Sequence, residues 1–167
     1  MSSRAVTALT TGLLLVIAVA LVIQSGVLAP PLEPSDYENA TLTVRDGNGT
    51  TLDTVDVRIA DTDRKRYVGL SETASLGSGE GMLFVHESVD SRAYVMRNMS
   101  FAIDILFVAP DGTVTMVDHA STEPGERGDE LTQYEGRGQY VLEVPRGYAN
   151  ATGVDEGDVV IVPDSVG

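Results

Sequence analysis

The chain has 167 residues, no cysteine, and 25 acidic against 11 basic side chains, which gives a formal net charge of −14. The lack of cysteine excludes disulfides, thiolate metal sites and cysteine nucleophiles. The acid excess makes nucleic acid and anionic lipid headgroups poor partners. Outside an apolar N-terminal segment, about 130 residues remain, enough for one domain and not for two.

An apolar run extends from Ala5 to Ile23 at the start of the chain. A helix of about 19 residues spans roughly 28 Å, which is close to the thickness of the hydrocarbon core of a bilayer. Arg4 precedes the run and the next base is Arg45, so the positive-inside rule places the N-terminus in the cytoplasm. We therefore predict a single-pass cell-membrane protein with residues 1–29 as anchor and the C-terminal domain extracellular. A cleaved signal peptide, which would make the protein secreted, is the alternative.

Two features of the composition indicate the environment of the chain after the apolar run. Lys65 is the only lysine, and an acid excess with so little lysine is typical of adaptation to multimolar salt, although an ordinary acidic secreted domain also fits. All four asparagines lie in Asn-x-Ser/Thr triplets. We predict glycans on Asn39, Asn48 and Asn150, whereas Asn98 belongs to a motif described below. The alternative is that asparagine favours turns at these positions.

Residues 30–39 are rich in proline and acids and predict a linker. The following region, residues 40–163, is predicted to be one extracytoplasmic β domain, because short segments with the apolar pattern of strands recur along it. These segments are residues 40–45, 51–60, 81–86, 92–97, 103–109, 113–119, 139–144 and 158–162. Turn residues at 46–49 make the first two a predicted hairpin, and Pro110-Asp111-Gly112 predicts a second tight turn.

Two short helical segments are predicted between the strands. Asp61 or Thr62 could cap a helix that Gly69 ends, and a second helix or turn is expected within residues 147–157. Residues 122–138 are charged and rich in glycine, which predicts a long surface loop. The expected fold is mostly β, an antiparallel sandwich or open barrel of about eight short strands with one or two short helices, preceded by one transmembrane helix.

Two carboxylates interrupt apolar strands, Asp104 and Glu143. A buried carboxylate costs several kcal/mol unless it is paired or hydrogen-bonded, and Arg97 and Asn98 are the donors expected nearest to Asp104. The two acids could form an acid/base pair or a cation site. Each could equally be a structural acceptor for backbone or arginine donors.

The two histidines, His86 and His119, each end a predicted strand beside an acid. Surface positions are expected for them rather than a metal site, because nothing in their spacing brings them together. The chain also lacks a serine-hydrolase motif, a phosphate-binding loop, a dinucleotide fingerprint and a zinc-protease motif. We therefore predict no metal and no cofactor, and an enzymatic activity is left open but is not favoured.

Six short motifs follow one another at characteristic spacings. They are Gly69-Leu70, Gly81 to Phe84, Met96-Arg97-Asn98, Ile103 to Phe107, Tyr140 to Val144, and Gly157-Asp158. In this order they resemble the domain of unknown function 192 family over residues 57–162. The resemblance implies a compact, mostly β domain, often behind a signal or membrane segment, and implies no reaction. Two positions depart from the family pattern, with Val95 in place of a usual Trp and Met99 in place of a common Thr.

The function expected from these observations is a binding or accessory module of the cell envelope, with a small polar ligand, such as a sugar, or an envelope protein as partner. The candidate ligand-binding residues are Met96, Arg97, Asn98, Asp104 and Glu143. The alternative is a carboxylate-based hydrolase, for which Asp104 and Glu143 must open into one cleft. A third hypothesis is protein contact through the loop at residues 122–138.

Overall fold

The computed structural model describes residues 30–166. A compact unit begins at Pro34, and its described residues form seven strands, two short α-helices and two short 3-10 helices. The strands are β1 (Glu38–Arg45), β2 (Thr51–Ala60), β3 (Glu80–Tyr94), β4 (Ile103–Val108), β5 (Val114–Ala120), β6 (Tyr134–Pro145) and β7 (Val159–Ile161). The helices are η1 (Pro34–Asp36), α2 (Asp63–Val68), η2 (Gly128–Glu130) and α3 (Tyr148–Thr152).

The predicted membrane segment from Ala5 to Ile23 lies outside the described residues. Within residues 30–166, no helix has both the length and the apolar character needed to cross a bilayer.

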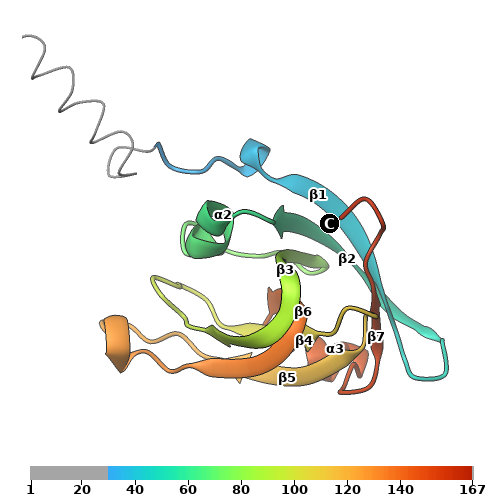
Figure 1. Ribbon diagram of the computed structural model, residues 1–167. Helices are drawn as coiled ribbons and strands as arrows, with labels where there is room; N and C mark the ends of the chain where they lie inside the picture. Colours follow the sequence, from blue (N-terminus) through green and yellow to red (C-terminus); the bar gives the residue numbers. More distant parts are fainter. Residues whose placement is uncertain (1–29, 167) are drawn as a thin grey trace, which may run out of the picture. The chain divides into compact units, whose positions relative to one another are not determined.

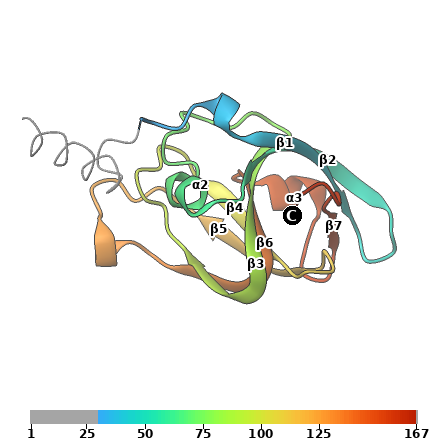
Figure 2. The same cartoon turned by 45° about the horizontal axis from the view of Figure 1, so that its top comes forward.

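One curled sheet contains all seven strands in the order β5-β4-β6-β3-β2-β1-β7 (Figures 1 and 2). Its strand pairs are antiparallel except for β2 and β3, which run parallel because the chain returns through α2 between them. At one corner Thr113 bridges to Val159, so the start of β5 is joined to β7. The sheet therefore forms a half-barrel.

This architecture confirms the mostly β prediction and corrects it in two respects. The described strands number seven rather than about eight, because the segment predicted at residues 81–86 and the first three residues of the one predicted at 92–97 belong to one long strand, β3. Residues 87–91 between them are exposed, and the register with β6 shifts between Val85 and Asp90. The sheet is also mixed rather than purely antiparallel. The predicted loop at residues 122–138 is shorter than expected, since its last five residues begin β6.

The local predictions for the hairpin and the first helix are confirmed. Strands β1 and β2 pair antiparallel from Glu38 opposite Ile59. The Thr62 side chain accepts a hydrogen bond from the Lys65 amide, and Gly69, with φ of 52°, donates its amide to the Lys65 carbonyl. A threonine cap and a glycine with positive φ thus define a helix of only six residues.

The main hydrophobic core lies on the inner face of the curl. Buried residues from most strands and from α3 share it, among them Leu42, Val57, Leu83, Leu106, Leu142, Val144, Tyr148 and Ala149. Directly paired residues of neighbouring strands point to the same face of a sheet. The pairs Leu83 with Leu142 and Leu142 with Leu106 therefore fix which face of β3, β6 and β4 is the inner one.

The opposite face of β3, β4 and β6 is also covered. Its buried residues include Met82, Phe84, Ile103, Ile105, Phe107 and Val141. Burial on both faces explains why all six residues of β4 are buried and why its sequence shows no alternation. The candidate site lies on this outer face.

A glycine in β6 allows the long β3–β6 ribbon to fold over the outer face. A Cβ atom at Gly136 would lie 2.3 Å from the Phe107 ring. Phe107 is fully buried and also contacts Tyr94 edge to face, with ring centroids 6.0 Å apart. The Phe107 ring therefore leaves no room for a side chain at position 136.

We predict that Gly136→Ala lowers the free energy of unfolding by about 2 kcal/mol or more, because Phe107 must leave its position in a packed layer. Gly47→Ala is the matched control. A Cβ there would have only one neighbour, at 4.0 Å, and the φ of Gly47 lies outside the positive range that strains residues with a side chain. Urea unfolding of both variants measures the difference. Equal stability of the two variants would contradict the packing described for Gly136.

Candidate functional site

The structure separates the two strand carboxylates. Asp104 pairs with Val144, which belongs to the inner core, whereas Glu143 pairs with Met82 and Ile105 on the outer face. Asp104 and Glu143 are therefore on opposite faces of the sheet. Each is buried, with exposures of 0% and 6%.

Asp104 has a full set of hydrogen-bond donors. Its Oδ1 accepts from Arg146 Nη1 at 2.9 Å and from His119 Nδ1 at 2.8 Å. Its Oδ2 accepts from the backbone amides of Gly147 at 3.1 Å and Ala149 at 3.0 Å. These two amides belong to the start of α3, so the carboxylate fixes the helix to β4. The donors expected from sequence, Arg97 and Asn98, are not the ones used.

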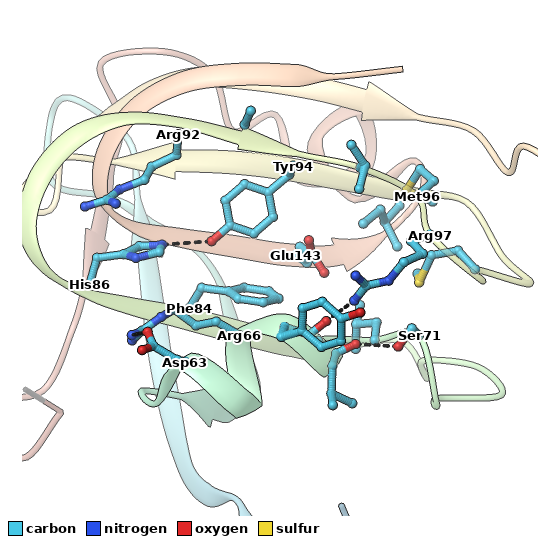
Figure 3. Close-up of a pocket in the computed structure, with 18 of the residues that line it drawn as sticks. Asp63, Arg66, Ser71, Phe84, His86, Arg92, Tyr94, Met96, Arg97 and Glu143 are labelled. Atoms are coloured by element: carbon cyan, nitrogen blue, oxygen red, sulfur yellow. Dashed lines mark hydrogen bonds and ion pairs between the residues drawn. The ribbon is translucent and has the colours of Figure 1, made fainter. Parts of the chain in front are cut away.

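Glu143 has no such partners. No group among residues 30–166 forms a hydrogen bond or ion pair with its carboxyl. The carboxyl lies at the base of a pocket of about 510 Å³. Figure 3 shows it pointing into the space bounded by Phe84, Tyr94, Met96 and Arg97. We name this space the Glu143 pocket.

Three segments form the walls of the Glu143 pocket. Helix α2 and the turn after it form one wall, from Asp63 to Ser71. The two halves of β3 form another, because the strand bends until Tyr94 contacts Phe84 edge to face with centroids 5.0 Å apart. The lining is completed by four residues after β3 and by one residue of β4, namely Val95, Met96, Arg97, Met99 and Ile103.

A neutral pair of side chains, His86 and Tyr94, lies inside the bend of β3. His86 Nε2 and the Tyr94 hydroxyl are 2.9 Å apart. Burial, together with the positive charges of the nearby Arg92 and Arg66, lowers the pKa of His86 to about 4. Burial also raises the pKa of Tyr94 well above its usual value. Both groups therefore stay uncharged near neutral pH and share one hydrogen bond.

Three arginines line the Glu143 pocket, and they differ in how fully they are used. Arg66 donates to the carbonyls of Asp61 and Val85 and to the Asp63 carboxylate. Arg97 donates to the Tyr67 carbonyl and stacks on the Tyr67 ring, 3.9 Å from its centroid. Arg92 donates one bond, to the Ser88 carbonyl at 2.7 Å, and its buried Nε has no partner among the described residues.

The ionisation of Glu143 follows from its surroundings. Burial raises the pKa of this carboxyl from 4.5 to about 8. The unfolded chain loses this proton near pH 4.5, whereas the folded chain keeps it until about pH 8. Between these values the folded state binds more protons, so the free energy of unfolding falls as pH rises through this window. At neutral pH the group is an uncharged acid that can donate a hydrogen bond.

The structure brings together three of the five candidate ligand-binding residues. Met96, Arg97 and Glu143 line the pocket. Asn98 is exposed outside its lining, in a turn with φ of 56°, a backbone region that asparagine tolerates better than most residues. Asp104 is sealed against α3 on the other face.

Several pocket residues were not singled out from sequence. Arg92 and Tyr94 meet His86, which the sequence analysis places at a strand end, only because β3 bends back on itself, and no local pattern signals such a bend. The basic run at residues 64–66 gave a usable signal, since Arg66 lies in the pocket wall. Val95, where the family usually has Trp, also lies on this wall and is 40% exposed.

The two histidines occupy separate environments. His86 lies in the Glu143 pocket, and His119 donates to Asp104. Among residues 30–166, no three side chains of His, Asp or Glu gather as a metal ion would require.

Comparison with known proteins gives the family. Residues 43–162 match DUF192, described as uncharacterized ACR, COG1430. The chain belongs to the DUF192 family. Among curated proteins, none matches this sequence.

Solved structures show the same fold as this DUF192 domain. A protein of unknown function from Novosphingobium aromaticivorans is 29% identical, with a TM-score of 0.65 over 80% of this chain and 93% of that one. A protein from Sinorhizobium meliloti, described as a candidate transcription regulator, is 24% identical, with a TM-score of 0.68 over 75% of this chain and 94% of that one. The second likeness extends to the fold alone.

We predict that Glu143→Gln makes the DUF192 domain more stable than the native chain above about pH 8, and equally stable near pH 5. The amide stays neutral, so the variant no longer loses several kcal/mol of unfolding free energy across this pH window. Chemical unfolding at a series of pH values measures this. Glu135→Gln, an exposed position of the same strand, is the control. A variant less stable than native at every pH would contradict the unpartnered state of Glu143.

The opposite result is expected for the other carboxylate. Asp104→Asn should lower the free energy of unfolding by about 3 kcal/mol, because an amide group would face donors that a carboxylate satisfies. Asp129→Asn, in the exposed η2 helix, is the control for the loss of one negative charge. If both variants unfold at the same urea concentration, Asp104 does not hold α3 as described.

Proposed function

We propose that this domain is a binding module that holds a small polar molecule in the Glu143 pocket. The observation that carries the proposal is the buried Glu143 carboxyl without a partner at the base of an open pocket. Buried polar groups in folded proteins nearly always have a hydrogen-bond partner. A bound molecule would supply the partner that the chain itself does not.

The pocket suits this role in size and lining. A volume of about 510 Å³ is in the range of small-molecule sites. Phe84, Met96 and Ile103 provide apolar walls, and the Glu143 carboxyl provides a polar group with free hydrogen-bonding capacity. Apolar walls with a few convergent polar groups are typical of binding sites.

Binding is favoured over the carboxylate hydrolase. Such an enzyme needs its two carboxyls on either side of one bond in one cleft. Asp104 and Glu143 lie on opposite faces of the sheet, and both oxygens of Asp104 are held by structural donors. The pair therefore does not share a substrate.

The place proposed for this module is the outer side of the cell membrane. The support is the apolar run from Ala5 to Ile23 with its single preceding charge. The asparagines of all four Asn-x-Ser/Thr triplets are exposed, as glycan attachment at Asn39, Asn48 and Asn150 requires. A tethered module of this kind would present the pocket to molecules outside the cell or in the envelope.

The test is a thermal-shift screen of the full chain in detergent and molar salt at pH 6.5, against sugars, polyols, amino acids and organic acids. A ligand specific for the folded state should raise the melting temperature in a concentration-dependent way. We expect at least one compound to do so for the native chain and for Glu135→Gln, and not for Glu143→Leu, which removes the polar group at the pocket base. An undiminished response of Glu143→Leu, or no response of the native chain to any compound, would refute the proposal.

A further inference from the structure

We propose that the Glu143 pocket binds an uncharged amide whose N–H and C=O groups lie side by side, as in a primary amide or a lactam, through two parallel hydrogen bonds to the Glu143 carboxyl. The O–H of Glu143 donates to the amide oxygen, and the amide N–H donates to the second oxygen of Glu143. The inference rests on the proposed function and names the chemical class of the ligand.

The Glu143 carboxyl has one donor and one acceptor to offer. Burial raises its pKa to about 8, so the group carries a proton near pH 6.5. A protonated carboxyl donates through its O–H and accepts at its other oxygen. The residue is only 6% exposed, yet neither oxygen is fully enclosed, so both can be reached from the pocket. A ligand that satisfies both oxygens must present an acceptor and a donor next to each other in one plane.

The neighbouring polar side chains of the lining have partners of their own. His86 and Tyr94 share a hydrogen bond of 2.9 Å. Ser71 donates its hydroxyl to the Val68 carbonyl at 2.6 Å. A ligand at the base of the pocket therefore has to find its polar contacts at Glu143.

The arginines of the lining are directed to other groups. Arg66 donates to two carbonyls and a carboxylate. Arg97 is stacked on the Tyr67 ring and donates to the Tyr67 carbonyl. Figure 3 shows the Arg92 guanidinium directed away from Glu143. Since these guanidinium groups are committed elsewhere, an uncharged ligand fits the pocket base better than an anion. A carboxylate also has no donor for the second oxygen of Glu143.

The apolar walls favour an amide over a sugar. Leu70, Phe84, Met96 and Ile103 surround the polar base. A sugar bonded to Glu143 would turn its remaining hydroxyls toward these walls, and buried hydroxyls without partners cost free energy. A simple amide has no further polar group, and its carbon skeleton would cover the apolar walls.

The two-point contact requires the proton on Glu143. The ionised carboxylate loses its donor, and its negative charge then faces the amide oxygen. With a pKa of about 8, roughly one Glu143 in ten keeps the proton at pH 9, so amide affinity should be about tenfold lower at pH 9 than at pH 6.5. The other titratable or charged groups that line the pocket are Asp63, Arg66 and Tyr67 of α2, His86, Arg92 and Tyr94 of β3, and Arg97.

The experiment titrates the full chain, in detergent and molar salt, with matched probes. Benzamide and pyrrolidinone carry the adjacent N–H and C=O groups, whereas N,N-dimethylbenzamide and N-methylpyrrolidinone lack the N–H. Benzoate and glucose represent the acid and the sugar. Binding is followed by NMR of the methionine methyl groups, because Met96 and Met99 line the pocket and Met116 of β5 does not.

We expect benzamide or pyrrolidinone to shift the signals of Met96 and Met99 and to leave that of Met116 unchanged. The amide that binds should do so roughly tenfold or more tightly than its N-methylated partner, since the lost N–H leaves a buried acceptor unpaired. It should also bind more tightly than benzoate and glucose.

Variants at position 143 test the contact itself. Glu143→Gln keeps a donor and an acceptor side by side without titrating, so amide binding should persist with equal affinity at pH 6.5 and 9. Glu135→Gln, at an exposed position of the same strand, should keep the pH dependence of the native chain. Glu143→Leu should abolish binding, whereas Glu135→Leu should leave it unchanged. If Glu143→Leu does not fold, the N-methylated probes and Glu143→Gln still decide the question.

The outcomes distinguish this inference from the proposed function. The inference is wrong if the N-methylated probes, benzoate or glucose bind as tightly as the amides, or if amide binding by the native chain is independent of pH. It is also wrong if no amide binds while the wider screen yields another ligand that depends on Glu143. In those cases the proposed function stands. If neither the amides nor any compound of the wider screen binds, both fail.

Discussion

The buried carboxylate of Asp104 is the contact on which the arrangement of the half-barrel depends. It joins β4, β5 through His119, and the start of α3 in one hydrogen-bonded cluster. Tyr148 and Ala149 of α3 then complete the inner core. Four donors, one of them an arginine, offset the cost of burying the charge. The cluster therefore fixes α3 to β4 and β5 on the inner face of the sheet.

Glu143 shows how the same chemistry can serve a different purpose one strand away. Both acids are buried on neighbouring strands, but only Asp104 has partners. A structural carboxylate is recognised by its donors, and a carboxyl without donors retains hydrogen-bonding capacity for something outside the chain. The contrast between the two sites is the reason to place function at Glu143 and stability at Asp104.

The sequence was sufficient for the class of fold, the first hairpin and α2 with its Thr62 cap, because these depend on local patterns. It did not predict on which face of the sheet either carboxylate lies. Strand β4 and the second half of β6 are buried on both sides, so alternation does not mark which residues share a face. Residues 87–91, mostly polar, resemble a loop but continue β3 through its bend. The site depends on this bend and on strand register, both of which are long-range properties.

Strand β3 belongs to two parts of the molecule at once. Its first half lies in the wall of the half-barrel, and its second half, paired with β6, closes the pocket over Phe84. The pocket wall formed by β3 is thus part of a hydrogen-bonded sheet. Ligand binding would therefore cost little conformational entropy of this part of the chain. Which ligands bind would depend on their fit to a preorganised shape. The same pairing limits how far this wall can move, since widening the pocket on this side would require breaking the pairing of β3 with β6.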